Sequence, residues 1–230
     1  MTSQLLGALD AADRQTIIDS CDEVPLSLGD VLIEAQTVPK FVYFPLRGVV
    51  STIARYRDGR TIEMATVGNE GCTGIGIISG GEHELAVQLV QSEGEALALR
   101  LPDLKRLMTE LPSFKEVLTN YLQAYIYQIL VSGACNGRHG LNERLARWLL
   151  QMQDRSGRQK LVMTQEILAE MLGVRRQSVT LAAGALQEAG LVSYRRGTIE
   201  VLNREGLEAA SCECYAMVRT AYERFLPQKM

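Results

Sequence analysis

The sequence predicts an α+β protein with a small antiparallel β domain, a long helix, and a helical domain that ends in a β-hairpin. Three observations support this fold class. Short β-type runs separated by turn residues fill residues 24–101, and an apolar stripe at helical spacing follows over residues 113–136. A helix, a tight turn, a second helix and a hairpin then succeed one another over residues 164–202. We expect a β domain at 1–111, a long helix at 112–138 and a C-terminal domain at 139–230.

The first region reads as a helix over residues 4–20 and then as an antiparallel roll. Turn signals such as Arg57-Asp58-Gly59 separate the strands. The glycine run over residues 68–81 lacks Gly-Lys-Ser/Thr, so turns are a better interpretation than a nucleotide loop. The predicted strands are VLIEA, FVYFPL, GVVSTIARY, TIEMATV, AVQLVQS and EALALRL.

The long helix carries more apolar surface than a small β domain needs for its own lid. A second copy of the chain is the simplest partner for that surface, so the sequence predicts a homodimer. The alternative is a helix buried wholly within its own subunit. The predicted dimer contacts are Val117, Leu118, Tyr121, Leu122, Tyr125 and Ile129.

Residues 164–202 have the order of a winged helix-turn-helix. Thr164 suits a helix N-cap, and Gly173 can take the left-handed conformation that ends the first helix. The second helix starts with arginines, and the hairpin turns at Arg196-Gly197. The alternative is an ordinary helical hairpin with a solvated basic rim. A final helix is expected over about residues 204–224, with Asn203 as its cap.

Charge supports contact with a polyanion. The whole chain has a net charge of −3, but residues 138–204 hold eleven Lys or Arg against six Asp or Glu. Arg suits guanine and Gln suits adenine in the major groove, whereas hydroxyls suit phosphate. The predicted DNA contacts are Thr164, Gln165, Arg175, Arg176, Gln177, Ser178, Thr180, Leu181, Arg195 and Arg196.

The remaining side chains give little sign of other chemistry. No nucleophile–base pair or paired acid constellation stands out, so we expect no enzyme. The five cysteines show no CxxC pair and no zinc spacing, which predicts reduced thiols, no metal and a cytoplasmic protein. Cys212 and Cys214 fall on one expected helix and so should point apart. His83 and His139 read as lone histidines. No apolar stretch approaches membrane-spanning length, and the N-terminus does not read as a signal peptide.

Six residues carry a resemblance to a known family. The pattern Thr164, Ala169, Gly173, Arg176, Ser178 and Val179 resembles that of the CRP/FNR family of bacterial transcription regulators (cyclic-AMP receptor protein / fumarate–nitrate regulator), and the resemblance covers nearly the whole chain. It implies a cyclic-nucleotide-binding-like jelly roll and a DNA-reading helix. In it Arg176 and Gln177 would read bases, whereas Thr164 and Ser178 would hold phosphate. Gly48, Gly59 and Gly68 fall where that family turns its strands.

The sequence departs from the family at several places. Arg175 stands where the family often has a capping Ser, and Gln177 stands where it often has Glu. Leu181 stands where a second base-reading Arg is common. The operator should therefore differ from the family's best-known site. Thr73 stands where cyclic-nucleotide binders place a ribose-holding Glu.

The effector region argues against the family's known cofactors. The place of the family's phosphate-binding Arg is taken by Glu82, His83 and Glu84. The place of its adenine-binding hydroxyls is taken by Ile129 and Leu130. Cyclic AMP, an iron–sulfur cluster and haem are therefore all unexpected, although an unidentified small-molecule effector stays open. The expected partners are double-stranded DNA, a second copy of the chain and RNA polymerase. The rival interpretation is a small-molecule or redox sensor that signals through protein partners.

Overall fold

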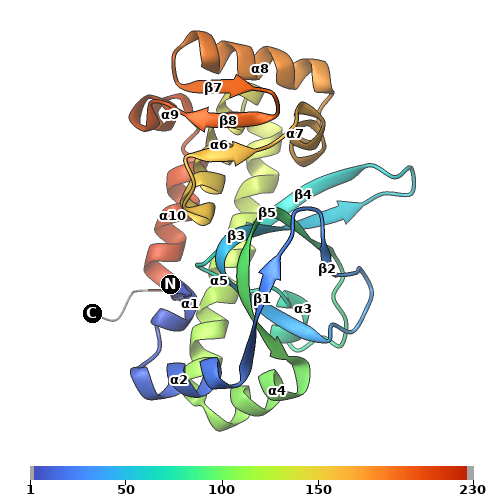
Figure 1. Ribbon diagram of the computed structural model, residues 1–230, viewed down its shortest axis with the longest axis vertical. Coiled ribbons are helices and arrows are strands. Elements are labelled where there is room, and N and C mark those ends of the chain that lie inside the picture. The colour runs from blue at the N-terminus through green and yellow to red at the C-terminus, as the bar shows by residue number, and fades with distance from the viewer. Residues whose placement is uncertain (1–2, 227–230) are drawn as a thin grey trace.

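The computed structural model describes residues 3–226, which form a β-roll, a long central helix and a compact winged helix-turn-helix (Figure 1). The helices are α1 (Gln4–Gly7), α2 (Ala11–Asp19), α3 (Ile75–Ile78), α4 (Leu101–Glu110), α5 (Pro112–Arg138), α6 (Leu141–Ser156), α7 (Gln165–Leu172), α8 (Arg176–Glu188), α9 (Arg204–Ala210) and α10 (Cys214–Phe225). The strands are β1 (Cys21–Leu26), β2 (Val31–Ile33), β3 (Phe41–Arg55), β4 (Thr61–Val67), β5 (Val87–Arg100), β6 (Lys160–Val162), β7 (Val192–Arg195) and β8 (Thr198–Val201).

The β-roll is an antiparallel sheet in the order β1-β5-β3-β4, with β2 paired to β5. Its strands are fewer and longer than predicted, because four expected short runs merge into β3 and β5. The resemblance predicted that the chain turns between strands at Gly48, but Gly48 does not end a strand. It sits at a bulge inside β3 with φ of +84°, and an added Cβ would lie 2.6 Å from the Ser92 carbonyl oxygen. The bulge bends the long strand without cutting it.

The predicted N-terminal helix is two helices. Asp10 caps α2 by accepting from the Asp13 N–H at 2.9 Å, and this cap separates α2 from the short α1.

The N-terminal half of α5 packs inside its own subunit. Leu118, Tyr121 and Tyr125 are buried in the core that α5 shares with the β-roll. These three predicted dimer contacts are therefore wrong, because a side chain buried in one subunit has no surface left for another. Val117, Leu122 and Ile129 are only half-buried, so they keep some surface outside this core.

The winged helix-turn-helix is confirmed where it was predicted. α7 and α8 are followed by the β7–β8 hairpin, and β6 adds a third strand in the order β6-β8-β7. The hairpin turns at Arg196 and Gly197, which have φ of +49° and +76°.

The C-terminal helix is not continuous. α9 ends at Ala210, and α10 starts only at Cys214 and then runs back along α5 towards the N-terminus (Figure 1). Leu226 reaches the core of the β-roll. The last helix thus joins the two ends of the molecule.

Within residues 3–226, no helix is long and apolar enough to cross a membrane.

Candidate nucleic-acid interface

The two helices that would present DNA contacts are fixed by local signals. The Thr164 side chain accepts from the Ile167 N–H at 3.3 Å and so caps α7. Gly173 ends α7 in the left-handed conformation, and Val174 donates back to the Ala169 carbonyl at 2.9 Å. The inner face of α8 packs on α6 and α7, and all three helices contribute to one core, so the start of α8 is held at the surface.

The start of α8 points outward. Arg176 and Gln177 are exposed, and Leu181, one turn further along, is 77% exposed although it is apolar. An apolar side chain left in water beside two base-reading types suits contact with a thymine methyl. Arg175 occupies the N-cap without a side-chain hydrogen bond, as expected.

Two contacts hold this surface in the free chain. The Arg176 guanidinium lies 2.7 Å from the Glu166 carboxylate, and the Thr180 hydroxyl donates to Gln165 at 2.8 Å. All four side chains lie at the surface, with Gln165 the most shielded. The contacts therefore orient α8 against α7 but remain open to exchange for a ligand.

The wing adds a second basic element. An open hollow of about 480 Å³ separates it from the two helices. Its walls are Thr164, Gln165, Glu166, Arg176, Tyr194, Arg196 and Gly197. Four of the predicted DNA contacts line this hollow: Thr164, Gln165, Arg176 and Arg196. Arg175, Gln177, Thr180, Leu181 and Arg195 are exposed but do not line it, and Ser178 is half-buried.

Comparison with known proteins identifies this unit. Residues 143–210 match the model of the Crp-like helix-turn-helix domain. The chain is similar to FixK2 from Bradyrhizobium japonicum, with 17% identity, 84% of this chain and 98% of that chain covered, and a TM-score of 0.71. Residues 143–210 therefore form a Crp-like helix-turn-helix domain, and the chain has the fold of solved CRP/FNR-type regulators.

Two further structures share this fold. The c-di-GMP responsive global regulator CLP from Xanthomonas campestris is 16% identical over 84% of this chain and 99% of its own, with a TM-score of 0.67. A CRP-family transcriptional regulator from Thermus thermophilus is 18% identical over 82% and 96%, with a TM-score of 0.65. No curated protein matches the sequence.

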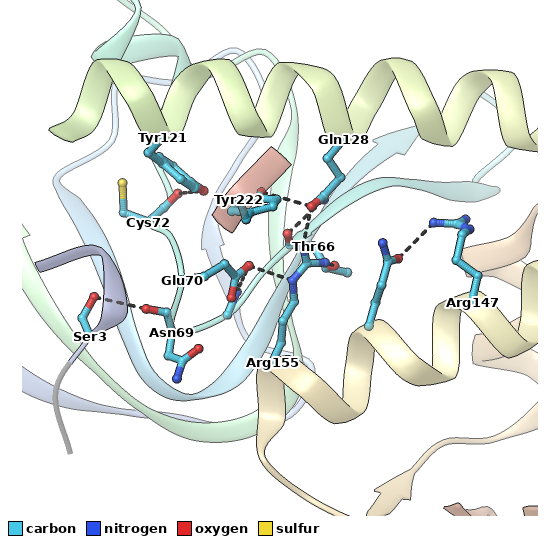
Figure 2. A network of polar contacts seen from close by, with 12 residues as sticks. Ser3, Thr66, Asn69, Glu70, Cys72, Tyr121, Gln128, Arg147, Arg155 and Tyr222 are labelled. Atoms are coloured by element: carbon cyan, nitrogen blue, oxygen red, sulfur yellow. Dashed lines mark hydrogen bonds and ion pairs between the residues drawn. The ribbon is translucent and has the colours of Figure 1, made fainter. Parts of the chain in front are cut away.

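A buried polar network fastens the helix-turn-helix unit to the β-roll and α5 (Figure 2). Arg155, near the end of α6, lies 2.7 Å from Glu70 and also donates to Thr66 and Gln128. Its guanidinium stacks over the Tyr222 ring at 5.6 Å. We call this set of five residues the junction: Thr66, Glu70, Gln128, Arg155 and Tyr222. Sequence reasoning missed it, because its members come from four separate parts of the chain.

A second contact crosses the same boundary. Glu63 on β4 accepts from Trp148 on α6 at 2.8 Å and from Ser51 at 2.6 Å. Burial raises the pKa of Glu63 to about 7, although both hydrogen bonds act in the opposite direction. The carboxyl therefore titrates near neutral pH at the boundary between β-roll and DNA-binding unit.

The space between the β-roll and α5 is filled by side chains of the chain itself. The Tyr125 hydroxyl lies 2.5 Å from that of Thr52, and the Tyr121 hydroxyl donates to the Cys72 carbonyl at 2.8 Å. A hollow of about 410 Å³ lies elsewhere, between α6, α10 and the Asn69-Glu70 turn.

Of the three residues predicted to stand at the phosphate position, only Glu84 turns inward. It is 3% exposed and accepts from the Ile77 N–H of α3 at 3.2 Å, whereas Glu82 and His83 are exposed. Thr73 is buried, and its hydroxyl accepts from the Tyr43 N–H.

Proposed function

We propose that the chain is a homodimeric, sequence-specific DNA-binding regulator of transcription that is not controlled by cyclic AMP. The observation that carries the DNA part is the exposed start of α8. There Arg176, Gln177 and Leu181 stand free of the protein core beside a basic wing. Bidentate Arg and Gln contacts supply base discrimination in the major groove. Two such units would read half-sites about 34 Å apart on one face of the duplex.

The dimer part rests on the C-terminal half of α5. Ile126 is 46% exposed and Leu130 is 65% exposed, which is unusual for apolar side chains at the centre of a long helix. Around them lies an exposed row with alternating spacings of four and three residues, the period of a coiled-coil seam. The row is Thr119, Gln123, Ile126, Leu130, Gly133 and Gly137. Open space around Gly133 and Gly137 permits a close helix–helix approach.

The interior of the β-roll leaves no evident room for cyclic AMP. Tyr121 and Tyr125 fill the space between the sheet and α5. The Glu84 carboxylate already accepts from the α3 backbone, at the position where the resemblance would place a phosphate. A bound cyclic phosphate would have to displace a buried carboxylate of the same sign. A thermal-shift titration with cyclic AMP should show no stabilisation, and a dose-dependent rise would contradict this part of the proposal.

Selection of binding sites from random duplexes, followed by a salt titration of the selected site, tests the DNA part. We expect the logarithm of the association constant to fall linearly with the logarithm of salt concentration. Arg176→Ala should weaken binding roughly tenfold or more and relax preference at one position per half-site, since one good Arg–guanine pair is worth about 1–3 kcal/mol. Arg57→Ala, which removes an exposed arginine from the β3–β4 turn, is the matched control. A flat salt response, or equal losses in both variants, would overturn the proposal.

Leu130→Glu tests the dimer. It places two like charges near the two-fold axis of the proposed seam, so we expect a shift to monomer in sedimentation at micromolar concentration. Leu85→Glu changes a side chain that is 81% exposed on the β-roll and should leave the parent's oligomeric state unchanged. A parent chain that sediments as a monomer would refute the dimer.

A further inference from the structure

Four side chains of metal-binding type meet where α5 ends. Cys135 and His139 come from the last turn of α5 and its C-cap. Cys212 lies in the turn between α9 and α10, and Cys214 is the first residue of α10. Their ligand atoms all lie within 4.8 Å of one another. The expectations that His139 is a lone histidine and that Cys212 and Cys214 point apart are wrong, because the four ligand atoms come together here.

The reason for the error is the break after α9. On one continuous helix, Cys212 and Cys214 would point in different directions. The chain instead leaves the helix after Ala210 and starts α10 at Cys214, so both thiols turn to the same side. Cys135 and His139 are four residues apart, which places them on one face of α5. The two pairs then meet across 77 residues of sequence.

From this geometry we infer a mononuclear zinc site formed by Cys135, His139, Cys212 and Cys214. Tetrahedral Zn²⁺ holds sulfur at about 2.3 Å and nitrogen at about 2.0 Å, which separates neighbouring ligand atoms by roughly 3.5–3.8 Å. The Sγ atoms of Cys135 and Cys212 are 3.5 Å apart, and Cys214 Sγ is 3.6 Å from His139 Nδ1. Three thiolates and one imidazole complete the coordination shell, as in structural rather than catalytic zinc sites.

The histidine is oriented as a metal ligand would be. Its Nε2 lies 3.1 Å from the Glu213 carboxylate, while its Nδ1 faces the thiols. A carboxylate on the far nitrogen fixes the tautomer that leaves Nδ1 free to coordinate, an arrangement common around protein-bound zinc. Glu213 sits between the two cysteines in sequence, so the same short turn provides two ligands and the residue that orients a third.

The surroundings suit a closed site with one net negative charge. The three cysteines are at most 5% exposed, and Val131 and Val218 pack beside them. Three thiolates with Zn²⁺ leave one negative charge, and α6 brings Arg144 and Arg147 close enough for their charges to interact with the thiols. Zinc binding would release the protons of the three thiols to solvent and leave His139 neutral.

The position of the site gives it a consequence for the DNA-binding unit. Zn²⁺ would link the end of the proposed dimer helix to the turn that follows α9, immediately beyond the matched helix-turn-helix domain. It would thereby fix α10 against α5. This inference stands on the four side chains alone, so it is independent of whether DNA or cyclic AMP binds.

The direct test loads the intact protein, purified under reducing conditions, with Zn²⁺ or Co²⁺. We expect about one metal ion per chain by elemental analysis. Co²⁺ should give the strong visible bands of a tetrahedral centre and a thiolate charge-transfer band in the near ultraviolet. Removal of the metal with a chelator should lower the melting temperature by several degrees and metal re-addition should restore it.

Variants locate the site. Cys212→Ala and Cys214→Ala should lose the cobalt charge-transfer intensity, whereas Cys21→Ala, outside the cluster, should keep it. Glu213→Gln retains all four ligands, so it should bind about one ion with roughly tenfold lower affinity in competition with a chromogenic chelator. Glu223→Gln, within α10, should bind the metal with the affinity of the parent. This pair keeps the test valid even if the cysteine variants fold poorly.

Three results would overturn the inference. One is a fully reduced, folded protein that binds neither metal. Another is iron–sulfur absorption from a loaded cluster. The third is a native Cys135–Cys212 disulfide found by mass spectrometry in protein prepared without oxidant.

Discussion

Arg176 and Arg155 are the same residue type in opposite surroundings. Arg176 stands on the outer face of the DNA-binding unit, 64% exposed, with one carboxylate as its partner. Arg155 is 7% exposed at the junction, where Glu70, Thr66, Gln128 and the Tyr222 ring surround it. An exposed ion pair is weak and exchangeable, whereas a buried one is costly to break. The first arginine is thus available to a ligand, and the second holds the architecture together.

Arg155→Ala should have the largest effect on the free energy of unfolding. It leaves the Glu70 carboxylate buried without its charge partner, which typically costs about 3–5 kcal/mol. Arg100→Ala removes an arginine that is 66% exposed from a pair with Asp103 and should cost less than about 1 kcal/mol. Urea unfolding of both variants measures the difference. Similar losses would show that burial does not separate the two kinds of pair.

Glu63→Gln should change how stability depends on pH. The folded pKa of Glu63 is raised from 4.5 to about 7, so the folded state holds a proton that the unfolded state has already lost. The protonated carboxyl therefore stabilises the fold at low pH, and this contribution is lost as pH rises through about 7. A shift of this size corresponds to about 3 kcal/mol.

Unfolding midpoints measured from pH 5 to pH 8 provide the check. The parent should lose stability over this range relative to Glu63→Gln, because the glutamine variant has no proton to release. Parallel curves for the two proteins would contradict the titration of Glu63.

Glu166→Gln should give the smallest effect and act only on DNA binding. It frees Arg176 from a carboxylate 2.7 Å away and removes a negative charge from the face that would meet phosphate. Because exposed pairs are worth about 0.2–1 kcal/mol, we expect the dissociation constant for DNA to fall by about two- to fivefold. Glu188→Gln, at the other end of α8, makes the same charge change as a control. Equal gains in DNA affinity for both variants would show that the effect comes from the change in net charge and not from the release of Arg176.

The two regions also differ in how far the sequence predicts them. The helix-turn-helix could be predicted because its signals are local: the Thr164 cap, the Gly173 terminus and the Arg196-Gly197 turn lie within 34 residues. In the junction and the Cys/His cluster, side chains up to 94 positions apart in the sequence are in contact. No local sequence pattern predicts such contacts. Periodicity showed that α5 is amphipathic but did not show which apolar positions face the β-roll, so Leu118, Tyr121 and Tyr125 were assigned to the wrong partner.

The path of α10 has a consequence for how the protein is made. Tyr222 and Leu226 pack into the core of a β-roll whose strands end at Arg100. During synthesis the β-roll emerges first, yet its core stays unfinished until Tyr222 and Leu226 leave the ribosome. The nascent chain must therefore keep apolar surface covered for more than a hundred residues of elongation. A chain released before Tyr222 would lack the end of α10 and, with it, part of the core of the β-roll. We expect proteases to degrade such a chain, so that no partly active fragment accumulates.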